Sequence, residues 1–327
     1  MTIKANAGRA STAAILTRRE FLSISAAAGS STLSSWDLQS NSASMSKAMG
    51  LHSSSNQPLM VNVVLIPHLG GDARFLEGIR QSLSGCSSDA IVLCGLDDRC
   101  FEATVECRAE MNAASGIRKL LIHRPLTSTS ISRTLEQIHR DSELFLVDGW
   151  DLCMEHASDG EHGRRRLQLA LELISRTSLK AIGILLPKRK CCELSAAETI
   201  SSLASEFLEI SFVLLLRSTE PFVSQASEGT KLGESWRRIL GQPNVYIRSE
   251  ILPGAFNRHA VLGGFVGSHR VIWGKSHGGR NVSVGDIRMT LSKLCMSQER
   301  ISAYLGLNAA RVYSLCPEHY RNSDLAV

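Results

Sequence analysis

Long apolar runs, metal-site cysteine spacings and phosphate-binding glycine loops are all missing from this sequence, and each absence removes a class of protein. No run approaches the ~20 apolar residues of a membrane-spanning helix, so no stable membrane span is predicted. The nine cysteines are an odd number without the spacing of a zinc ribbon or a disulfide framework. No G-x-G-x-x-G or P-loop follows the first apolar run, which argues against a nucleotide-binding doubly wound fold.

Composition indicates a soluble globular protein with an ample core. The 327 residues are 43% hydrophobic and 20% charged, enough for one large domain or two ordinary ones. The net charge of +5 is mild, and the basic clusters at 164–166 and 188–190 have no aromatic residues between their cations. We therefore expect no nucleic-acid partner. The pattern does not reveal the oligomeric state.

The N-terminal residues 1–58 differ from the rest of the chain. Thr17-Arg18-Arg19-Glu20-Phe21-Leu22 matches the twin-arginine export consensus, and an Ala/Ser-rich run followed by a serine-rich stretch continues it. We expect a signal and a flexible tether here, with the twin-arginine machinery as a partner and the periplasm or cell envelope as the destination. An amphipathic N-terminal helix on a cytoplasmic protein is the alternative. Residues 59–327 would form the folded domain.

Eight short apolar runs alternate with segments of helical period. Continuously apolar runs of this length suit strands of a parallel sheet that is covered on both faces. The predicted strands are Val61–Ile66, Ala90–Cys94, Lys119–Ile122, Glu143–Val147, Ala181–Leu186, Ser211–Leu216, Asn244–Ile247 and Arg270–Trp273. Repeated strand–helix units predict an α/β fold, either an (α/β) barrel or a doubly wound sheet.

Three segments carry a resemblance to a known family. Trp236–Ser249, Arg270–Gly278 and Ile301–Tyr313 resemble the closing motifs of the amidohydrolase-related family of TIM-barrel hydrolases. The resemblance implies a TIM-like (β/α)8 barrel with its active site at the carboxyl ends of the strands. In that mapping Met60–Asp98 resembles the second and third strands. The first strand would then lie upstream of residue 60, incomplete or divergent, and the run Glu143–Val147 would be extra.

The resemblance also implies a divalent ion, but this sequence departs from the ligand pattern. Metal-dependent members carry His-x-His on the first strand, His on the fifth and sixth, and Asp at the eighth. Here no His-x-His precedes residue 60, while Lys188, Arg217 and Ser276 stand near the ends of the fifth, sixth and eighth strands. We therefore predict no metal and no other cofactor.

What remains near the predicted strand ends suits a metal-free site. Some members of the wider family hydrolyse lactones without metal and hold a substrate carboxylate with arginines. By that resemblance Arg217 and Arg248 would bind a carboxylate. His277 would act as general base beside Ser276. Lys188 and His68 are further candidate binding residues.

Other polar residues have a structural interpretation beside a functional one. His123 follows a predicted strand and could reach the mouth or be structural. Asp148 and Asp151 flank Trp150 and form either a carboxylate pair or a turn, while Cys94 behaves as a small hydrophobe inside an apolar run.

Two functional hypotheses follow. The first is an amidohydrolase-related hydrolase of a small lactone, ester or amide with an altered or metal-free site. The alternative is a catalytically inactive barrel that serves as an exported binding or scaffold protein. A small molecule is the expected partner in the first and a candidate ligand in the second.

Overall fold

Eight parallel strands, each hydrogen-bonded to the next in chain order, form the sheet. The computed structural model describes residues 60–66, 88–109, 111, 119–128, 130–143, 147–154, 160–186, 193–216, 229–249, 268–274, 284–293 and 296–315. The strands are β1 (Val61–Leu65), β2 (Ala90–Cys94), β3 (Lys119–Leu126), β4 (Gly149–Cys153), β5 (Ala181–Leu186), β6 (Ser211–Leu216), β7 (Val245–Ser249) and β8 (Val271–Trp273). The predicted TIM-like (β/α)8 architecture is confirmed.

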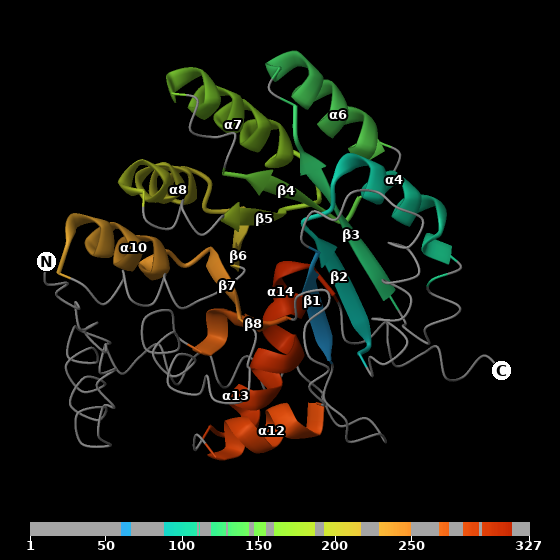
Figure 1. Cartoon of the computed structure of the whole chain (residues 1–327), viewed down its shortest axis with the longest axis vertical. Helices are drawn as coiled ribbons and strands as arrows, with labels where there is room; N and C mark the ends of the chain where they lie inside the picture. Colours follow the sequence, from blue (N-terminus) through green and yellow to red (C-terminus); the bar gives the residue numbers. More distant parts are fainter. Residues whose placement is uncertain are drawn as a thin grey trace, which may run out of the picture. The chain divides into compact units, whose positions relative to one another are not determined.

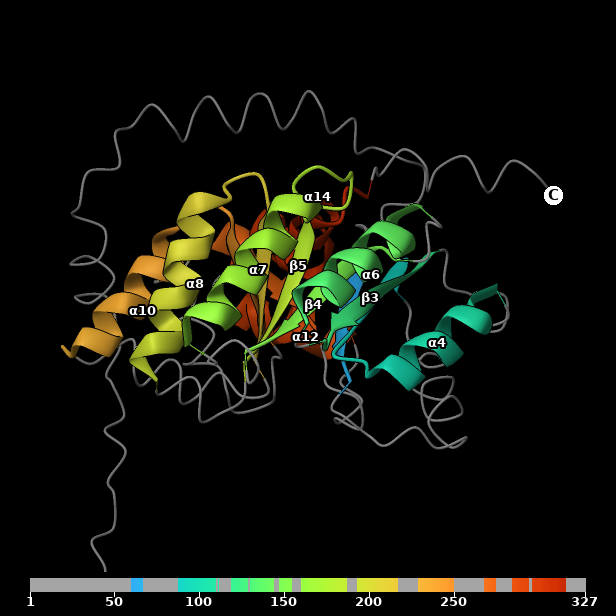
Figure 2. The same ribbon diagram turned by 90° about the horizontal axis from the view of Figure 1, so that it is seen from above.

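Helices α4 (Asp98–Glu106), α6 (Ile131–Glu143), α7 (Gly160–Ile174), α8 (Leu194–Glu206) and α10 (Lys231–Gly241) alternate with the strands from β2 to β7 and lie along their outer side (Figure 1). The short helix η2 (Ser268–Arg270) precedes β8. After β8 come α12 (Val284–Lys293), α13 (Gln298–Ser302), the π-helix η3 (Ala303–Leu307) and α14 (Asn308–Val312). Figure 2 shows α8 between α7 and α10, and Arg164 of α7 donates to Ser202 of α8 at 2.7 Å. Among the described helices, none combines the length and apolarity needed to cross a bilayer.

Side-chain caps explain where two of these helices begin. Asp97 accepts a hydrogen bond from the backbone N–H of Cys100 at 2.7 Å, and Thr230 accepts one from Gly233 at 3.1 Å. Each cap satisfies one of the four backbone donors that a helix leaves without an intrahelical partner at its N-terminus. The chain therefore turns from loop to helix at a residue that its sequence specifies.

The long strand β3 sets the stagger of the barrel. Its first half pairs with β2, from Lys119 opposite Ala90, and its second half pairs with β4, from His123 opposite Gly149. Such an offset between neighbouring strands is the shear that lets a parallel sheet curl into a barrel. It also brings the carboxyl end of β2 beside the middle of β3.

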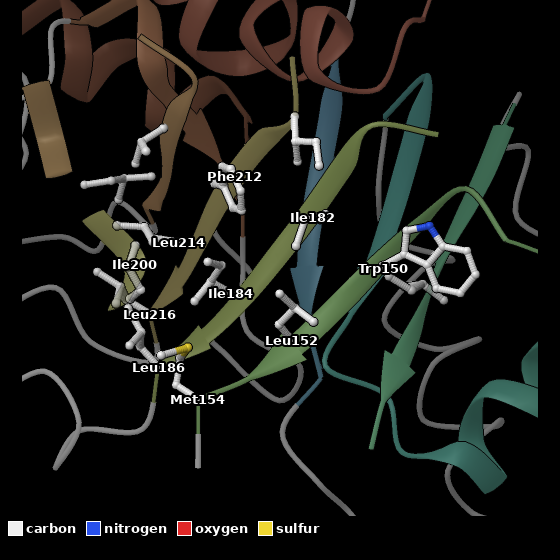
Figure 3. Packing of buried hydrophobic residues seen from close by; sticks show 14 of the residues in the cluster. Trp150, Leu152, Met154, Ile182, Ile184, Leu186, Ile200, Phe212, Leu214 and Leu216 are labelled. Carbon is white, nitrogen blue, oxygen red and sulfur yellow. The ribbon is translucent and has the colours of Figure 1, made fainter. Parts of the chain in front are cut away.

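Strand alternation divides the buried side chains into two cores. One set faces the helices and includes Trp150, Leu152, Ile184 and Leu214 (Figure 3). The other set faces the inside of the barrel and includes Val63, Val92, Cys94, Leu121, Val213 and Ile272. Because successive side chains of a strand point to opposite faces, His123 shares the inner face with Leu121.

The barrel is not sealed between β8 and β1. No hydrogen-bonded ladder joins these two strands among the described residues, and the segment from η3 to α14 packs against both. The Tyr304 hydroxyl donates to the Ser249 carbonyl at 2.8 Å, and the Asn308 side chain donates to the Val271 carbonyl at 2.8 Å. The C-terminal helices therefore cover the seam with side-chain hydrogen bonds to β7 and β8.

Two strand predictions are wrong. Residues 143–147 do not form the fourth strand, because Glu143 ends α6 and β4 begins at Gly149. The apolar run of Leu144–Val147 drew the prediction there, while the inward Asp151 interrupts the apolar pattern of the true strand. Within the described residues the sheet already has eight strands, and its first strand is β1 at Val61–Leu65 rather than a segment upstream of residue 60. Met60–Asp98 therefore contributes the first and second strands.

Candidate functional site

A polar cluster lies inside the barrel on three consecutive strands. Cys94 is the last residue of β2, His123 lies in β3 and Asp151 lies in β4. Their exposed fractions are 0% for Cys94, 0% for His123 and 1% for Asp151. Buried polar groups need partners, and the pairing within the cluster shows what each side chain does.

Asp151 holds the imidazole of His123. The His123 Nδ1 and the Asp151 Oδ1 are 2.8 Å apart, and the Asp151 Oδ2 accepts the backbone N–H of Gly95 at 2.6 Å. Gly95 has a φ of 76°, in the region that favours glycine, at the turn that follows β2. A carboxylate can only accept, so Nδ1 carries the proton and Nε2 presents its lone pair. The Nε2 atom is buried and has no hydrogen-bond partner among the residues that the structure describes.

Two glycines make room for this pair. A Cβ atom at Gly149, opposite His123 in the β3–β4 register, would overlap the imidazole. A Cβ atom at Gly183, opposite Asp151 in the β4–β5 register, would overlap the carboxylate. Each inward polar side chain therefore lies over a glycine of the next strand, where a larger residue would displace it.

Cys94 and Tyr313 complete the cluster. Tyr313 follows α14, and its ring meets the His123 ring edge-on with centroids 5.4 Å apart. Burial, and then the charge of Asp151, raise the pKa of the Cys94 thiol well above its ordinary value, while Arg248 opposes the shift. Burial, and then Cys94 and Asp151, raise the pKa of the Tyr313 hydroxyl in the same way. Both groups therefore keep their protons at neutral pH.

Arg248 lies on β7 with an exposed fraction of 1%. Its Nε donates to the Val63 carbonyl at 3.0 Å, and a terminal nitrogen donates to the Leu216 carbonyl at 3.2 Å. The side chain thus links β7 to β1 across the seam and to the end of β6. Its predicted role in binding a substrate carboxylate stays a prediction, beside this interstrand role.

The other predicted site residues lie outside the described part of the chain. These are His68, Lys188, Arg217, Ser276 and His277. Their predicted roles therefore stay predictions. Of the polar residues weighed in the sequence, the described structure brings His123 and Asp151 together.

The sequence missed most of the cluster. Asp148 does not pair with Asp151, because it binds Arg108 at 2.6 Å and the backbone N–H of Ile122 at 3.0 Å. Cys94 is inside an apolar run, and Tyr313 is the last residue of the Ile301–Tyr313 motif, for which the sequence indicated no role in a site. The sequence feature that could have indicated the cluster is Asp151 in β4, which lies two residues after Gly149 and therefore faces the same side of the strand, the inside of the barrel.

The divalent ion that the resemblance implies does not fit its usual positions. Lys188, Arg217 and Ser276 offer ammonium, guanidinium and hydroxyl groups where the family has imidazole or carboxylate. Cationic side chains repel an ion and supply no ligand. No catalytic step is therefore assigned to an ion at those strand ends.

Solved structures share this architecture. An amidohydrolase from Burkholderia multivorans with bound zinc aligns with a TM-score of 0.54 and 12% identity over 79% of this chain and 99% of that one. Dihydroorotase from Saccharomyces cerevisiae, in complex with 5-fluoroorotic acid, aligns with a TM-score of 0.53 and 9% identity over 81% and 86%. No protein-family model matches the sequence, and no curated protein matches it. The likeness confirms a TIM-like barrel as the fold.

Proposed function

We propose that this protein is a hydrolase of a small lactone, ester or amide, with an altered reaction centre at His123 and Asp151. The observation that carries the proposal is the His123 Nδ1–Asp151 Oδ1 hydrogen bond of 2.8 Å inside the barrel. It leaves the His123 Nε2 buried, oriented and without a hydrogen bond to the described part of the chain. The fold is one that hosts hydrolases, which supports the class of reaction by analogy.

In this reaction His123 is the general base. Nε2 takes a proton from a water molecule as that water attacks the substrate carbonyl, and the proton then passes to the leaving oxygen or nitrogen. Asp151 is the positioning residue, because its hydrogen bond selects the tautomer that leaves Nε2 free and stabilises the imidazolium that forms. Substrate must displace the groups that bury His123 before it can reach this nitrogen.

A second candidate is an inactive barrel that binds a small ligand or serves as a scaffold. The specific observation in its favour is burial: Cys94, His123 and Asp151 are all at most 1% exposed, and Arg248 already binds two backbone carbonyls. In that case the cluster contributes only to the structure of the barrel. Export to the cell envelope, indicated by Arg18 and Arg19, is compatible with both candidates.

The test is hydrolysis by the purified full chain of an aryl ester, a simple lactone and an anilide. We expect the His123→Gln variant to lose about 10²–10⁴-fold in rate, as for removal of a general base. The matched control is His139→Gln, whose side chain is 69% exposed on α6 and lies 3.3 Å from the carboxylate of Glu143. Equal activity of the His123 variant would place the base elsewhere. A folded protein without activity on all three substrates would favour the inactive barrel.

A further inference from the structure

The interior cluster combines a thiol, an imidazole and a carboxylate, three side-chain types that can each bind a metal ion. Cys94, His123 and Asp151 each offer one ligand atom, and the three atoms lie within 4.8 Å of one another. They come from three neighbouring strands, so the barrel backbone holds them at a common place. We propose that these three side chains form a binding site for one divalent transition-metal ion, with zinc as the preferred ion.

The donor set favours zinc over the hard cations. Thiolate, imidazole and carboxylate are the three ligand types that zinc takes, and catalytic zinc sites commonly use three protein ligands. Magnesium, calcium and manganese prefer oxygen ligands, so a cysteine counts against them. This set is distinct from the family positions after β5, β6 and β8, where the sequence has Lys188, Arg217 and Ser276.

The distances are within reach of coordination. Ligand atoms around a tetrahedral zinc ion are roughly 3.3–3.8 Å apart, as follows from bonds of about 2.0–2.3 Å. A group that lies within 4.8 Å can close to that spacing by small side-chain rotations. The glycines at 149 and 183 leave the imidazole and the carboxylate without a Cβ beneath them.

A second observation points to a missing partner. The His123 Nε2 is fully buried and has no hydrogen bond to the described residues, and a buried polar atom without a partner needs an explanation in a native structure. An ion bound to Nε2 would give this nitrogen a partner. For Asp151 to share that ion, its 2.8 Å hydrogen bond to His123 Nδ1 must be exchanged for a bond to the ion, so binding turns the imidazole and the carboxylate within the cluster.

The charges of the ligands also balance the charge of the ion. Binding exchanges the thiol proton of Cys94 for the ion, and the released proton goes to solvent. Thiolate and carboxylate then offset the two positive charges of the ion. Arg248, whose charge also acts on Cys94, donates its guanidinium to the Val63 and Leu216 carbonyls.

The site rests on the same residues as the proposed function and would regulate it. An ion on the imidazole takes the lone pair that the proposed general base uses, so the loaded protein is expected to be inactive as a hydrolase. Because the cluster is buried, loading is expected when the chain refolds with the ion present, as metal binding and folding are coupled.

The test is cobalt and zinc binding by the full chain, read without any activity assay. Protein refolded with Co²⁺ should take up one equivalent and show the near-ultraviolet charge-transfer band of a thiolate-bound ion. Cys94→Ser should abolish that band, and Asp151→Asn should weaken zinc binding by about 10–100-fold. The matched control is Cys100→Ser, a buried cysteine of α4 outside the cluster, which should keep both.

Three outcomes decide the matter. Uptake of one equivalent with a band that depends on Cys94 supports the site. Uptake without the band, or a band that survives Cys94→Ser, overturns it, as does absence of binding in protein shown to be folded by circular dichroism. Hydrolysis is measured separately, so a failed activity assay with intact cobalt binding would refute the proposed function and leave the metal site standing.

Discussion

The carboxylate of Asp151 fills the space in which any residue other than glycine at position 183 would place its Cβ atom. The same relation holds between the imidazole of His123 and Gly149. The barrel interior therefore admits two polar side chains only because the next strand has no side chain opposite them. The space left by the two glycines and the hydrogen bond between His123 and Asp151 together hold these side chains in place.

Alanine at either glycine should destabilise the protein. Gly149→Ala and Gly183→Ala would each force the facing side chain to move, at a cost of about 1–3 kcal/mol of unfolding free energy. Urea unfolding measures it. The matched control is Gly241→Ala at the end of α10, where an added Cβ meets nothing within 4 Å. A shift at 149 or 183 no larger than at 241 would contradict the relation.

Asp151→Asn should change the tautomer of His123 without a large change in the stability of the protein. The amide can accept from Gly95 with its oxygen and donate to His123 Nδ1 with its nitrogen, which moves the ring proton to Nε2. Asp151→Asn should therefore change the tautomer, visible in imidazole ¹⁵N shifts, with little loss of stability. Asp151→Ala leaves Gly95 N–H unpaired and should cost about 1–3 kcal/mol in unfolding free energy. An unchanged tautomer in the asparagine variant would argue against Asp151 as the positioning residue.

Asn244 stabilises the fold by donating hydrogen bonds from its side-chain nitrogen, so variants without this donor should be less stable. Its Nδ2 lies 2.9–3.0 Å from the carbonyls of Ala204, in the last turn of α8, and of Phe207 and Ile210, which follow that helix. Asn244→Ala should cost about 1–3 kcal/mol, and Asn244→Asp more, because a carboxylate has no donor and faces three oxygens. Thermal unfolding of both variants checks the order. Equal stability of the alanine and aspartate variants would contradict the expected repulsion between the carboxylate and the three carbonyls.

The buried thiols should resist alkylation in metal-free protein. The pKa of Cys94 is raised well above its ordinary value, and that of Cys100 is raised to about 12, in both cases first by burial. Iodoacetamide needs the thiolate, so the peptides with these cysteines should label more slowly than those with the half-buried Cys107 and Cys153. Peptide mass spectrometry gives the order directly.

The same shifts predict a loss of stability at alkaline pH. Above about pH 9 the unfolded chain releases the thiol protons that the folded chain still holds at Cys94 and Cys100. The unfolded state then binds fewer protons, so unfolding free energy falls as pH rises. Cys100→Ser should flatten this slope, and an unchanged slope would show that the thiols do not cause it.

Export should depend on the arginine pair. Replacing Arg18 and Arg19 together by lysine keeps the charge but removes the consensus, and we expect the full chain to remain in the cytoplasm. Cell fractionation of the natural host measures this, with Lys4→Arg as a charge-neutral control outside the motif. Unchanged export would favour an ordinary N-terminal helix.

The sequence located seven of the eight strands because their signal is local. Runs such as Ala181–Leu186 and Ser211–Leu216 are continuously apolar, and strands covered on both faces need that composition. The exception is β4, where Asp151 on the inner face breaks the run. The strand that carries the polar centre was thus the one that the apolar pattern could not show.

What the sequence determined by itself is an α/β fold of alternating strands and helices, because burial on both faces of a strand leaves its mark on consecutive residues. The resemblance of the closing motifs then favoured the barrel over the doubly wound sheet. What only the tertiary structure decided is the cluster. Cys94, His123, Asp151 and Tyr313 are separated by 28 residues or more, and their meeting depends on the stagger of β3 and on the C-terminal segment reaching the barrel interior. No local sequence pattern encodes the distances between these four residues, because the distances depend on how all eight strands and the C-terminal segment are arranged.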